Sequence, residues 1–292
     1  MLKKVKGLKH RRQLTLGSGE LYKEYCEMIS RREYQWTVAN KREEAIRNMR
    51  RVSWNHAGIG WTMDDTGRRG LPVDFSMRLN QARDLCSRKA LSAHVSERLL
   101  PDTKVAEVFE DLIEEYGPPL CVKLDNGSNL NGGPVLEVLH FHGVLVLNSP
   151  PHYPQYNGLM EWGQRELKWE MACLLMLMGK RPDIGMVQIV SDMALTRCNI
   201  RPRPCLSGQT SDNVFETRHE VMKAYTMNKR REVHAEIKDR TMRIMAHEKH
   251  GDRLTEQAAW RIAVETWLRR NGLITVSVAG RVLPYYDPLL VS

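Results

Sequence analysis

The order of strand-like and helix-like segments between residues 59 and 178 is the feature that most restricts the fold of this chain. Runs of strand length and segments with helical spacing of apolar residues follow one another as strands at 59–66, 77–85 and 89–95, a helix at 101–116, a strand at 120–124, a helix at 134–141, a strand at 144–148 and a helix at 158–178. Three successive strands followed by alternating helices and strands predict an α/β domain with a mixed sheet.

Three carboxylates stand where such a sheet brings side chains together. Asp64 closes the first strand, Asp125 follows the strand at 120–124, and Glu161 lies near the start of the helix at 158–178. Converging carboxylates repel one another unless cations lie between them. Mg²⁺ prefers oxygen ligands, and two such ions clamp the attacking and leaving oxygens of a phosphoryl transfer. These positions therefore predict a site for divalent cations.

The segment SPPHYPQYNGLMEWGQRELK contains the third carboxylate and two nearby cations. Glu161, Arg165 and Lys168 are spaced i, i+4 and i+7, so they share one helix face. We expect Glu161 to be a metal ligand and the two cations to contact DNA phosphates. Asn157 and the glycine after it tolerate the tight backbone that a helix start close to a ligand requires, so Asn157 joins the predicted DNA-binding residues.

Each of these features also has a structural explanation. Asp-Asn-Gly is usually a turn, and two aspartates at a strand end are compatible with a turn as well. A face with Glu, Arg and Lys is commonly solvated, with Arg165 and Lys168 paired to acidic neighbours such as Glu166. These alternatives stay open at this stage.

Charge is distributed unevenly along the chain. Residues 1–51 contain 14 Lys and Arg against 6 Asp and Glu, a net charge of +8. Residues 52–216 contain 16 against 20, a net −4, and residues 217–292 contain 14 against 9, a net +5. Two basic ends around an acidic centre suit a protein that binds a polyanion with its ends and concentrates carboxylates between them. Solvated basic tails would give the same counts.

The sequence contains no secretory signal pattern, no run of 18 apolar residues and no C-x-x-C pair among its six cysteines. We therefore expect free thiols, no membrane partner and a cytoplasmic protein, associated with the nucleoid if the source is bacterial.

Five motifs resemble the catalytic core of retroviral integrases and bacterial insertion-sequence transposases. They are W-T-M-D-D-T (61–66), D-L-C-S-R (84–88), G-P-P-L-C-V-K-L-D-N-G-S (117–128), H-G-V (142–144) and P-Q-Y-N-G-L-M-E (154–161). Residues 126–160, which are 35 residues, separate Asp125 from Glu161, and this is the separation typical of the family. The resemblance covers residues 54–216, ending with N-I-R-P-R-P-C-L-S-G-Q-T (199–210).

The resemblance implies an RNase H-like core with a mixed five-stranded sheet, and a DDE triad of Asp64, Asp125 and Glu161. It also implies two Mg²⁺ or Mn²⁺ ions and a DNA transposase or integrase, a polynucleotidyl transferase that cleaves DNA and transfers strands. Its partners would be double-stranded mobile-element ends and target DNA, bound by a homo-oligomer. In the family one residue and a Thr follow the first aspartate, which favours Asp64 over Asp65. The family's zinc-binding HHCC module has no counterpart here.

The chain is accordingly divided into a basic helical N-terminal arm (1–53), the catalytic core (54–216) and a C-terminal segment of helices and a β-hairpin (217–292). Helices are expected at 19–32 and 38–51 in the arm, and a long charged helix at 217–250 in the C-terminal segment. The functional alternatives are a catalytically silent DNA-binding or assembly protein derived from a mobile element, and a hydrolytic RNase H-like nuclease without strand transfer.

Overall fold

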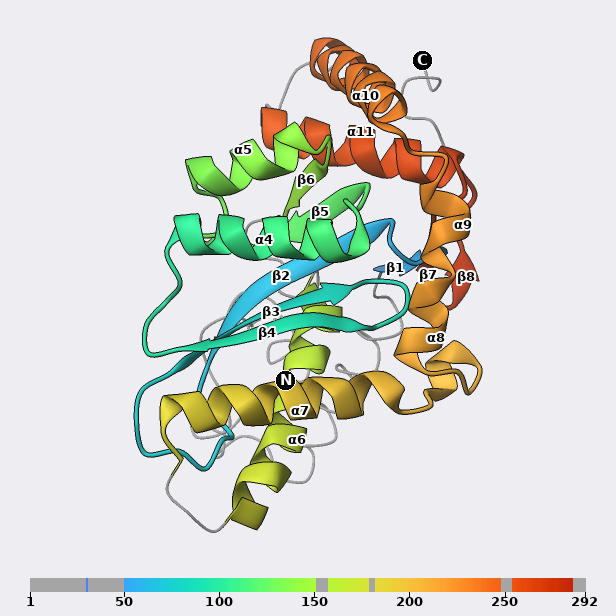
Figure 1. Cartoon of the computed structure of the whole chain (residues 1–292). Helices are drawn as coiled ribbons and strands as arrows, with labels where there is room; N and C mark the ends of the chain where they lie inside the picture. Colours follow the sequence, from blue (N-terminus) through green and yellow to red (C-terminus); the bar gives the residue numbers. More distant parts are fainter. Residues whose placement is uncertain (1–29, 31–49, 151–156, 179–181, 248–253, 286–292) are drawn as a thin grey trace. The chain divides into compact units, whose positions relative to one another are not determined.

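A mixed five-stranded sheet is the centre of the fold (Figure 1). The computed structural model describes residues 30, 50–150, 157–178, 182–247 and 254–285. The strand order is β4-β3-β2-β5-β6, with bounds β2 Gly60–Gly67, β3 Arg78–Asp84, β4 Ala90–Ser96, β5 Cys121–Leu124 and β6 Leu145–Asn148. β2, β3 and β4 are antiparallel neighbours, whereas β5 and β6 run parallel to β2. This order and these directions confirm the predicted RNase H-like core.

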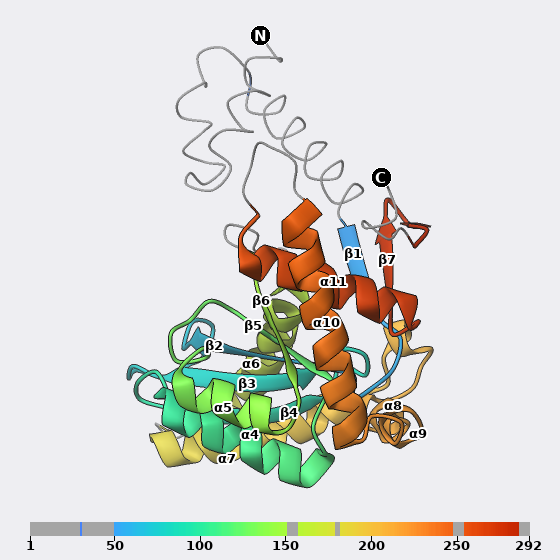
Figure 2. The same cartoon turned by 90° about the horizontal axis from the view of Figure 1, so that it is seen from above.

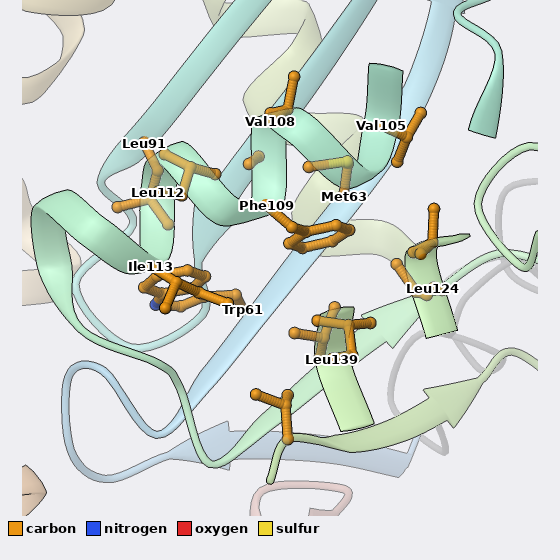
Figure 3. Close-up of a cluster of buried hydrophobic side chains, with 14 of the residues drawn as sticks. Trp61, Met63, Leu91, Val105, Val108, Phe109, Leu112, Ile113, Leu124 and Leu139 are labelled. Atoms are coloured by element: carbon orange, nitrogen blue, oxygen red, sulfur yellow. The ribbon is translucent and has the colours of Figure 1, made fainter. Parts of the chain in front are cut away.

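Helices cover both faces of the sheet. α4 (Asp102–Tyr116) and α5 (Gly133–Phe141) pack on one face, and α6 (Gly158–Met178) and α7 (Ile184–Ile200) pack on the other. Figure 3 shows how Trp61 and Met63 of β2 meet Phe109 of α4 in the first of these cores. Side chains alternate along a strand, so the residues between and after these two point toward α6 instead. β2 therefore presents Asp64 to the face that α6 covers.

The first predicted strand extends further than expected. Asp64 does not close β2, because the pairing with β3 continues as far as Gly67 opposite Arg78. The parallel pairing with β5, in contrast, ends at Met63 opposite Leu124. Asp64 is therefore an interior residue of β2. It lies just beyond the last residue pair of the ladder between β2 and β5.

The predicted charged helix at 217–250 is two helices in the structure, α9 (Arg218–Met222) and α10 (Met227–His247). Arg230 accounts for the break. Its guanidinium donates hydrogen bonds to the carbonyls of Tyr225, Pro118 and Pro119, which fixes the start of α10 against the loop after α4. Residues 248–250 of the expected helix lie outside the described residues.

α10 packs against α11 (Glu256–Arg270), and α11 lies along the edge strand β6 (Figures 1 and 2). The Trp260 indole donates a hydrogen bond to the Val146 carbonyl at 2.8 Å. Covering an edge strand in this way protects it from pairing with other chains. The core region also includes the short helix α8 (Ser211–Glu216).

A second, small sheet has the order β1-β7-β8, with bounds β1 Arg50–Trp54, β7 Ile274–Val278 and β8 Arg281–Val282. Ala279 and Gly280 have φ angles of 52° and 76°, as in a two-residue type I′ turn. The β-hairpin predicted in the C-terminal segment is thereby confirmed, with its turn at these two residues. The expected helix at 38–51 is wrong at Arg50 and Arg51, which pair in β1 instead.

The chain forms two compact units. Their described parts are residues 53–275 with 284 and 285, and residues 50–52 with 276–283. The expected helix at 19–32 and the rest of the helix at 38–51 lie outside the described residues, apart from Ser30. The division into three domains at residues 53 and 216 stays a prediction. Over the described residues, no helix is both long and apolar enough to cross a membrane.

Candidate active site

Asp64 and Asp125 lie just beyond the end of the parallel ladder between β2 and β5. The ladder between β2 and β5 ends at Met63 and Leu124, and each of these residues is followed directly by one of the two aspartates. Burial, with a smaller contribution from the negative charge of Asp125, raises the pKa of Asp64 to about 6. Asp125 is therefore close enough for its charge to act on the Asp64 carboxylate.

Two hydrogen bonds fix the orientation of the Asp64 carboxylate. Its Oδ1 accepts from the Asp65 backbone N–H at 2.8 Å, and its Oδ2 accepts from Gln164 Nε2 at 3.1 Å. Both interactions favour the ionised form and oppose the rise of the pKa caused by burial. Gln164 was not among the predicted site residues, although its position three residues after Glu161 places it on a neighbouring part of the same helix face.

Asp65 points to the opposite face of the sheet. Its two carboxylate oxygens accept hydrogen bonds from Asn80 Nδ2 at 3.1 Å and from Asn129 Nδ2 at 2.8 Å. Asn129, in the loop after β5, is thus a partner of Asp65. Because both oxygens of Asp65 are occupied by amides and Asp64 faces α6, the geometry favours Asp64 as the residue that acts with Glu161.

The loop after β5 is held by asparagines. Asn131 Nδ2 donates to the backbone carbonyl of Asp125 at 2.7 Å and to that of Gly127 at 2.9 Å. Asn131 Oδ1 in turn accepts from Asn148 at the end of β6. The loop therefore forms a turn, as the structural alternative proposed, and the same turn fixes the backbone of Asp125 beside the adjacent strand.

α6 begins at Gly158, so Glu161 is in its first turn with an exposed side chain. Lys168 is two turns further on and donates to Thr66 Oγ1 of β2 at 2.7 Å. Burial lowers the pKa of Lys168, and the negative charge of Asp64 opposes this shift. Arg165 is exposed on the same side of the helix. Glu161, Arg165 and Lys168 thus share a side of α6, as expected from their spacing.

Asn157 directly precedes α6. Its Oδ1 accepts a hydrogen bond from Ser149 Oγ at 3.1 Å, and the same hydroxyl is within 3.2 Å of the Leu124 carbonyl. Asn157 therefore connects the start of α6 with the ends of β5 and β6. The proline-rich approach at 151–156 lies outside the described residues.

Glu166 is a residue of α6 whose carboxylate pairs with two arginines. Arg203 donates to both of its carboxylate oxygens, at 2.8 and 3.0 Å, and Arg83 donates to one of them at 3.3 Å. The alternative in which Glu166 pairs with Arg165 and Lys168 on a solvated face is wrong. A Cβ at Gly163 would lie 2.4 Å from Arg83 Cζ, so a side chain at this position would displace the Arg83 guanidinium.

Among the residues that the structure describes, no three His, Cys, Asp or Glu side chains are grouped closely enough to hold a metal ion. Asp64 and Asp125 nevertheless have the chemistry of a hard-cation site, because they are two oxygen donors whose mutual repulsion a cation would relieve. Glu161 lies one turn before Gln164, which already touches Asp64. The residues present therefore fit a divalent cation at Asp64 and Asp125, with Glu161 on the adjacent helix turn.

Comparisons with known proteins return retroviral proteins. No family model matches the chain. Its sequence is 28% identical over 99 residues to Pol polyproteins of equine infectious anemia virus, strain Wyoming and isolate 1369. The match spans 34% of this chain and 8% of the polyprotein. The match is to a retroviral polyprotein, and the strand order is that of the predicted RNase H-like core.

Solved integrase structures align with the chain at lower sequence identity. The HTLV-2 integrase catalytic core in complex with magnesium has a TM-score of 0.47 and 17% identity, over 56% of this chain and 99% of that one. The BIV integrase catalytic core has a TM-score of 0.45 and 21% identity, over 58% and 100%. A simian T-cell lymphotropic virus intasome has a TM-score of 0.47 and 16% identity, over 74% of each chain.

Proposed function

We propose that this protein is a DDE-type DNA transposase or integrase that cleaves DNA and transfers the cut strand to a target. The observation that supports this proposal most is the placement of Asp64 and Asp125 beyond one parallel strand ladder, under a helix whose second turn contacts Asp64 through Gln164. Glu161 is in the first turn of that helix. The resemblance to integrase cores independently implies the same three residues.

Asp64, Asp125 and Glu161 would hold two divalent cations, Mg²⁺ or Mn²⁺. Such ions supply Lewis acid stabilisation of the attacking and leaving oxygens in a phosphoryl transfer. The neighbour crystallised with magnesium is in keeping with this choice of metal. The raised pKa of Asp64 fits the assignment as well, because repulsion from Asp125 is one of its causes and a bound cation would remove that repulsion.

In the first step a water oxygen would attack a phosphodiester of the element end in line. The phosphorus bond to the bridging 3′ oxygen would break and leave a free 3′-hydroxyl and a 5′-phosphate. In the second step the 3′-hydroxyl oxygen would attack a target phosphodiester, and the 3′ oxygen of the target would leave. Neither step needs a covalent protein intermediate, so the protein's contribution is positioning and electrostatic stabilisation.

The remaining residues of the site would position the DNA. Gln164 would orient the Asp64 carboxylate through the hydrogen bond to Oδ2. Lys168, beside Thr66 and Asp64, would contact a phosphate close to the reacting bond, and Arg165 would contact the backbone one helical turn away. Asn157 would set the start of α6 against the strand ends and contact the DNA from there.

The substrates would be the double-stranded ends of a mobile element and a target duplex. The basic ends of the chain, with net charges of +8 and +5 by residue count, would bind these duplexes. An intasome is among the structural neighbours, and we propose that this chain likewise acts as a homo-oligomer assembled on DNA.

The experiment is incubation of the full chain with a labelled duplex that contains the element end, with and without Mg²⁺, and with an unlabelled target. The proposal predicts a metal-dependent nick and joined products. A nick without joined products in the presence of a 3′-hydroxyl donor would identify a hydrolytic nuclease. DNA binding without any nick under all metal conditions would identify a silent assembly protein.

A further inference from the structure

We propose that the outward face of α6 binds unpaired nucleotides of DNA by stacking their bases on Trp162 and Trp169. This inference rests on the proposed function for the identity of the polyanion. The two tryptophans are exposed, with 43% and 61% of their surface accessible, on a helix whose opposite side is packed against the sheet. They are large apolar side chains for which the described residues provide no cover.

The two indoles are arranged along a line. They are seven residues apart, which is about 10.5 Å along a helix that rises about 1.5 Å per residue, and about two turns. Both therefore project from nearly the same side of α6. Trp162 directly follows Glu161, so a base on Trp162 would belong to a nucleotide close to the proposed site of cleavage.

Two buried guanidinium groups make cation–π contacts with Trp162. The guanidinium groups of Arg83 and Arg203 lie 5.8 and 5.4 Å from the centroid of its ring. Both groups donate to the same carboxylate of Glu166, so they lie on the same, inner side of the indole. This contact stiffens the ring and leaves its outer part accessible, which is the form that a stacking platform requires.

The charge around the tryptophans favours a polyanion. Two carboxylates of α6, Glu166 and Glu170, are paired with four arginines, namely Arg83 and Arg203 for the first and Arg197 and Arg201 for the second. The clusters have a net charge of +2, and the exposed Arg165 lies between the two tryptophans in sequence. Exposed aromatic rings among surplus arginines are the pattern of single-strand binding surfaces.

A second copy of this chain is the alternative occupant. α7 and the end of α6 also expose apolar side chains, namely Met176, Leu177, Met186, Ile189 and Met193. Trp162, in contrast, lies over the guanidinium groups of Arg83 and Arg203. We therefore assign the tryptophan face, and not the exposed face of α7, to nucleic acid.

The test measures binding of the full chain to a fluorescein-labelled oligothymidylate and to a labelled duplex, by anisotropy in EDTA so that catalysis plays no part. Trp169→Leu is the main variant, because Trp169 is exposed and its replacement leaves the core intact. Trp169→Phe keeps an aromatic ring, Trp162→Leu tests the second position, and Ile189→Ser is the matched control on α7.

We expect Trp169→Leu and Trp162→Leu each to weaken oligothymidylate binding about fivefold or more, since a stacked base contributes about 1–3 kcal/mol. Trp169→Phe should keep most of the affinity, Ile189→Ser all of it, and duplex binding should change much less. Unchanged oligothymidylate affinity in both leucine variants would overturn the proposal. A shift to smaller oligomers on sizing, with unchanged DNA binding, would overturn it in favour of the second copy.

The result is independent of the cleavage assay. A protein that binds oligothymidylate through these tryptophans but never cleaves DNA would refute the proposed function and leave this inference intact. If the protein cleaves and joins DNA and both leucine variants bind oligothymidylate normally, the proposed function stands and this inference is refuted.

Discussion

The side-chain amide of Gln164 donates a hydrogen bond to Asp64 Oδ2 at 3.1 Å, and this contact joins α6 to β2 at the point where the ladder between β2 and β5 ends. Gln164 is in the second turn of α6, and Glu161 is in the turn before it. One hydrogen bond between a helix and a strand thus relates two of the three carboxylates that we propose as metal ligands.

Gln164→Ala is therefore expected to weaken both metal binding and cleavage. Loss of a residue that orients a metal ligand typically costs about 10- to 100-fold in metal affinity or activity. Titration with Mn²⁺, followed by calorimetry, measures the affinity, and initial rates of nicking measure the activity. Gln164→Asn is the control that keeps the amide on a shorter side chain and should restore part of the loss. Metal affinity equal to that of the parent protein in Gln164→Ala would contradict a role in orienting Asp64.

Glu166→Gln and Glu161→Gln form a second pair, with opposite expected effects. Glu166→Gln removes the carboxylate that Arg83 and Arg203 share. Breaking such a buried ion pair costs about 3–5 kcal/mol of unfolding free energy. The remaining folded molecules should still cleave DNA. Glu161→Gln replaces an exposed carboxylate by a neutral amide, so it should leave the unfolding free energy nearly unchanged and abolish cleavage.

Urea denaturation and single-turnover cleavage, measured on the same two preparations, distinguish the roles. If Glu166→Gln proved fully stable while losing cleavage, the carboxylate on α6 that serves the site would have been misassigned.

Arg165→Ala and Lys168→Ala are expected to weaken binding of the element end by about 1 kcal/mol each, which is the net contribution of a typical hydrogen bond. Stability should change little for Arg165→Ala, which is exposed, and slightly more for Lys168→Ala, which loses the bond to Thr66. Anisotropy titrations over a range of salt concentrations check this. Each variant should also lower the logarithmic salt slope by about one, because one phosphate contact is lost.

The basic N-terminal residues provide a separate prediction. Removal of residues 1–49, which contain 12 Lys and Arg against 6 Asp and Glu, removes a net charge of +6 and preserves strand β1. DNA affinity should fall and its dependence on salt should become shallower, because fewer counterions are released on binding. A salt slope identical to that of the full chain would mean that these residues are only solvated and that the contacts lie elsewhere.

The sequence predicts the fold well because each element of the core has its own local pattern. The alternation in β2 and the helical spacing in α4 and α6 determine which side of each element is apolar, and the succession of the elements predicts a mixed α/β sheet. The RNase H-like strand order was implied by the family resemblance. The break between α9 and α10 was missed because it depends on Arg230, whose partners are the carbonyls of Pro118 and Pro119 more than a hundred residues earlier.

The candidate site was predictable in part for the same reason. Asp64 and Asp125 follow the last pair of the ladder between β2 and β5, and Glu161 is in the first turn of α6, so all three positions could be chosen from the sequence. The side chains that orient Asp64, bind Asp65 or pair with Glu166 are distant from them in the sequence. Glu166 resembles any solvated helix residue until Arg83 and Arg203 are placed beneath it, and the two asparagines that occupy Asp65 come from β3 and from the loop after β5.

The choice between the adjacent aspartates tests the central claim most directly. Asp64→Asn and Asp65→Asn make the same chemical change at neighbouring positions that face opposite sides of the sheet, Asp64 toward Gln164 and Asp65 toward Asn80 and Asn129. The measurement is Mg²⁺-dependent nicking of the labelled element end by each variant, with DNA binding measured in parallel. The account predicts that Asp64→Asn binds DNA and does not cleave it, whereas Asp65→Asn cleaves. Cleavage by Asp64→Asn, with loss of cleavage in a folded Asp65→Asn, would contradict it.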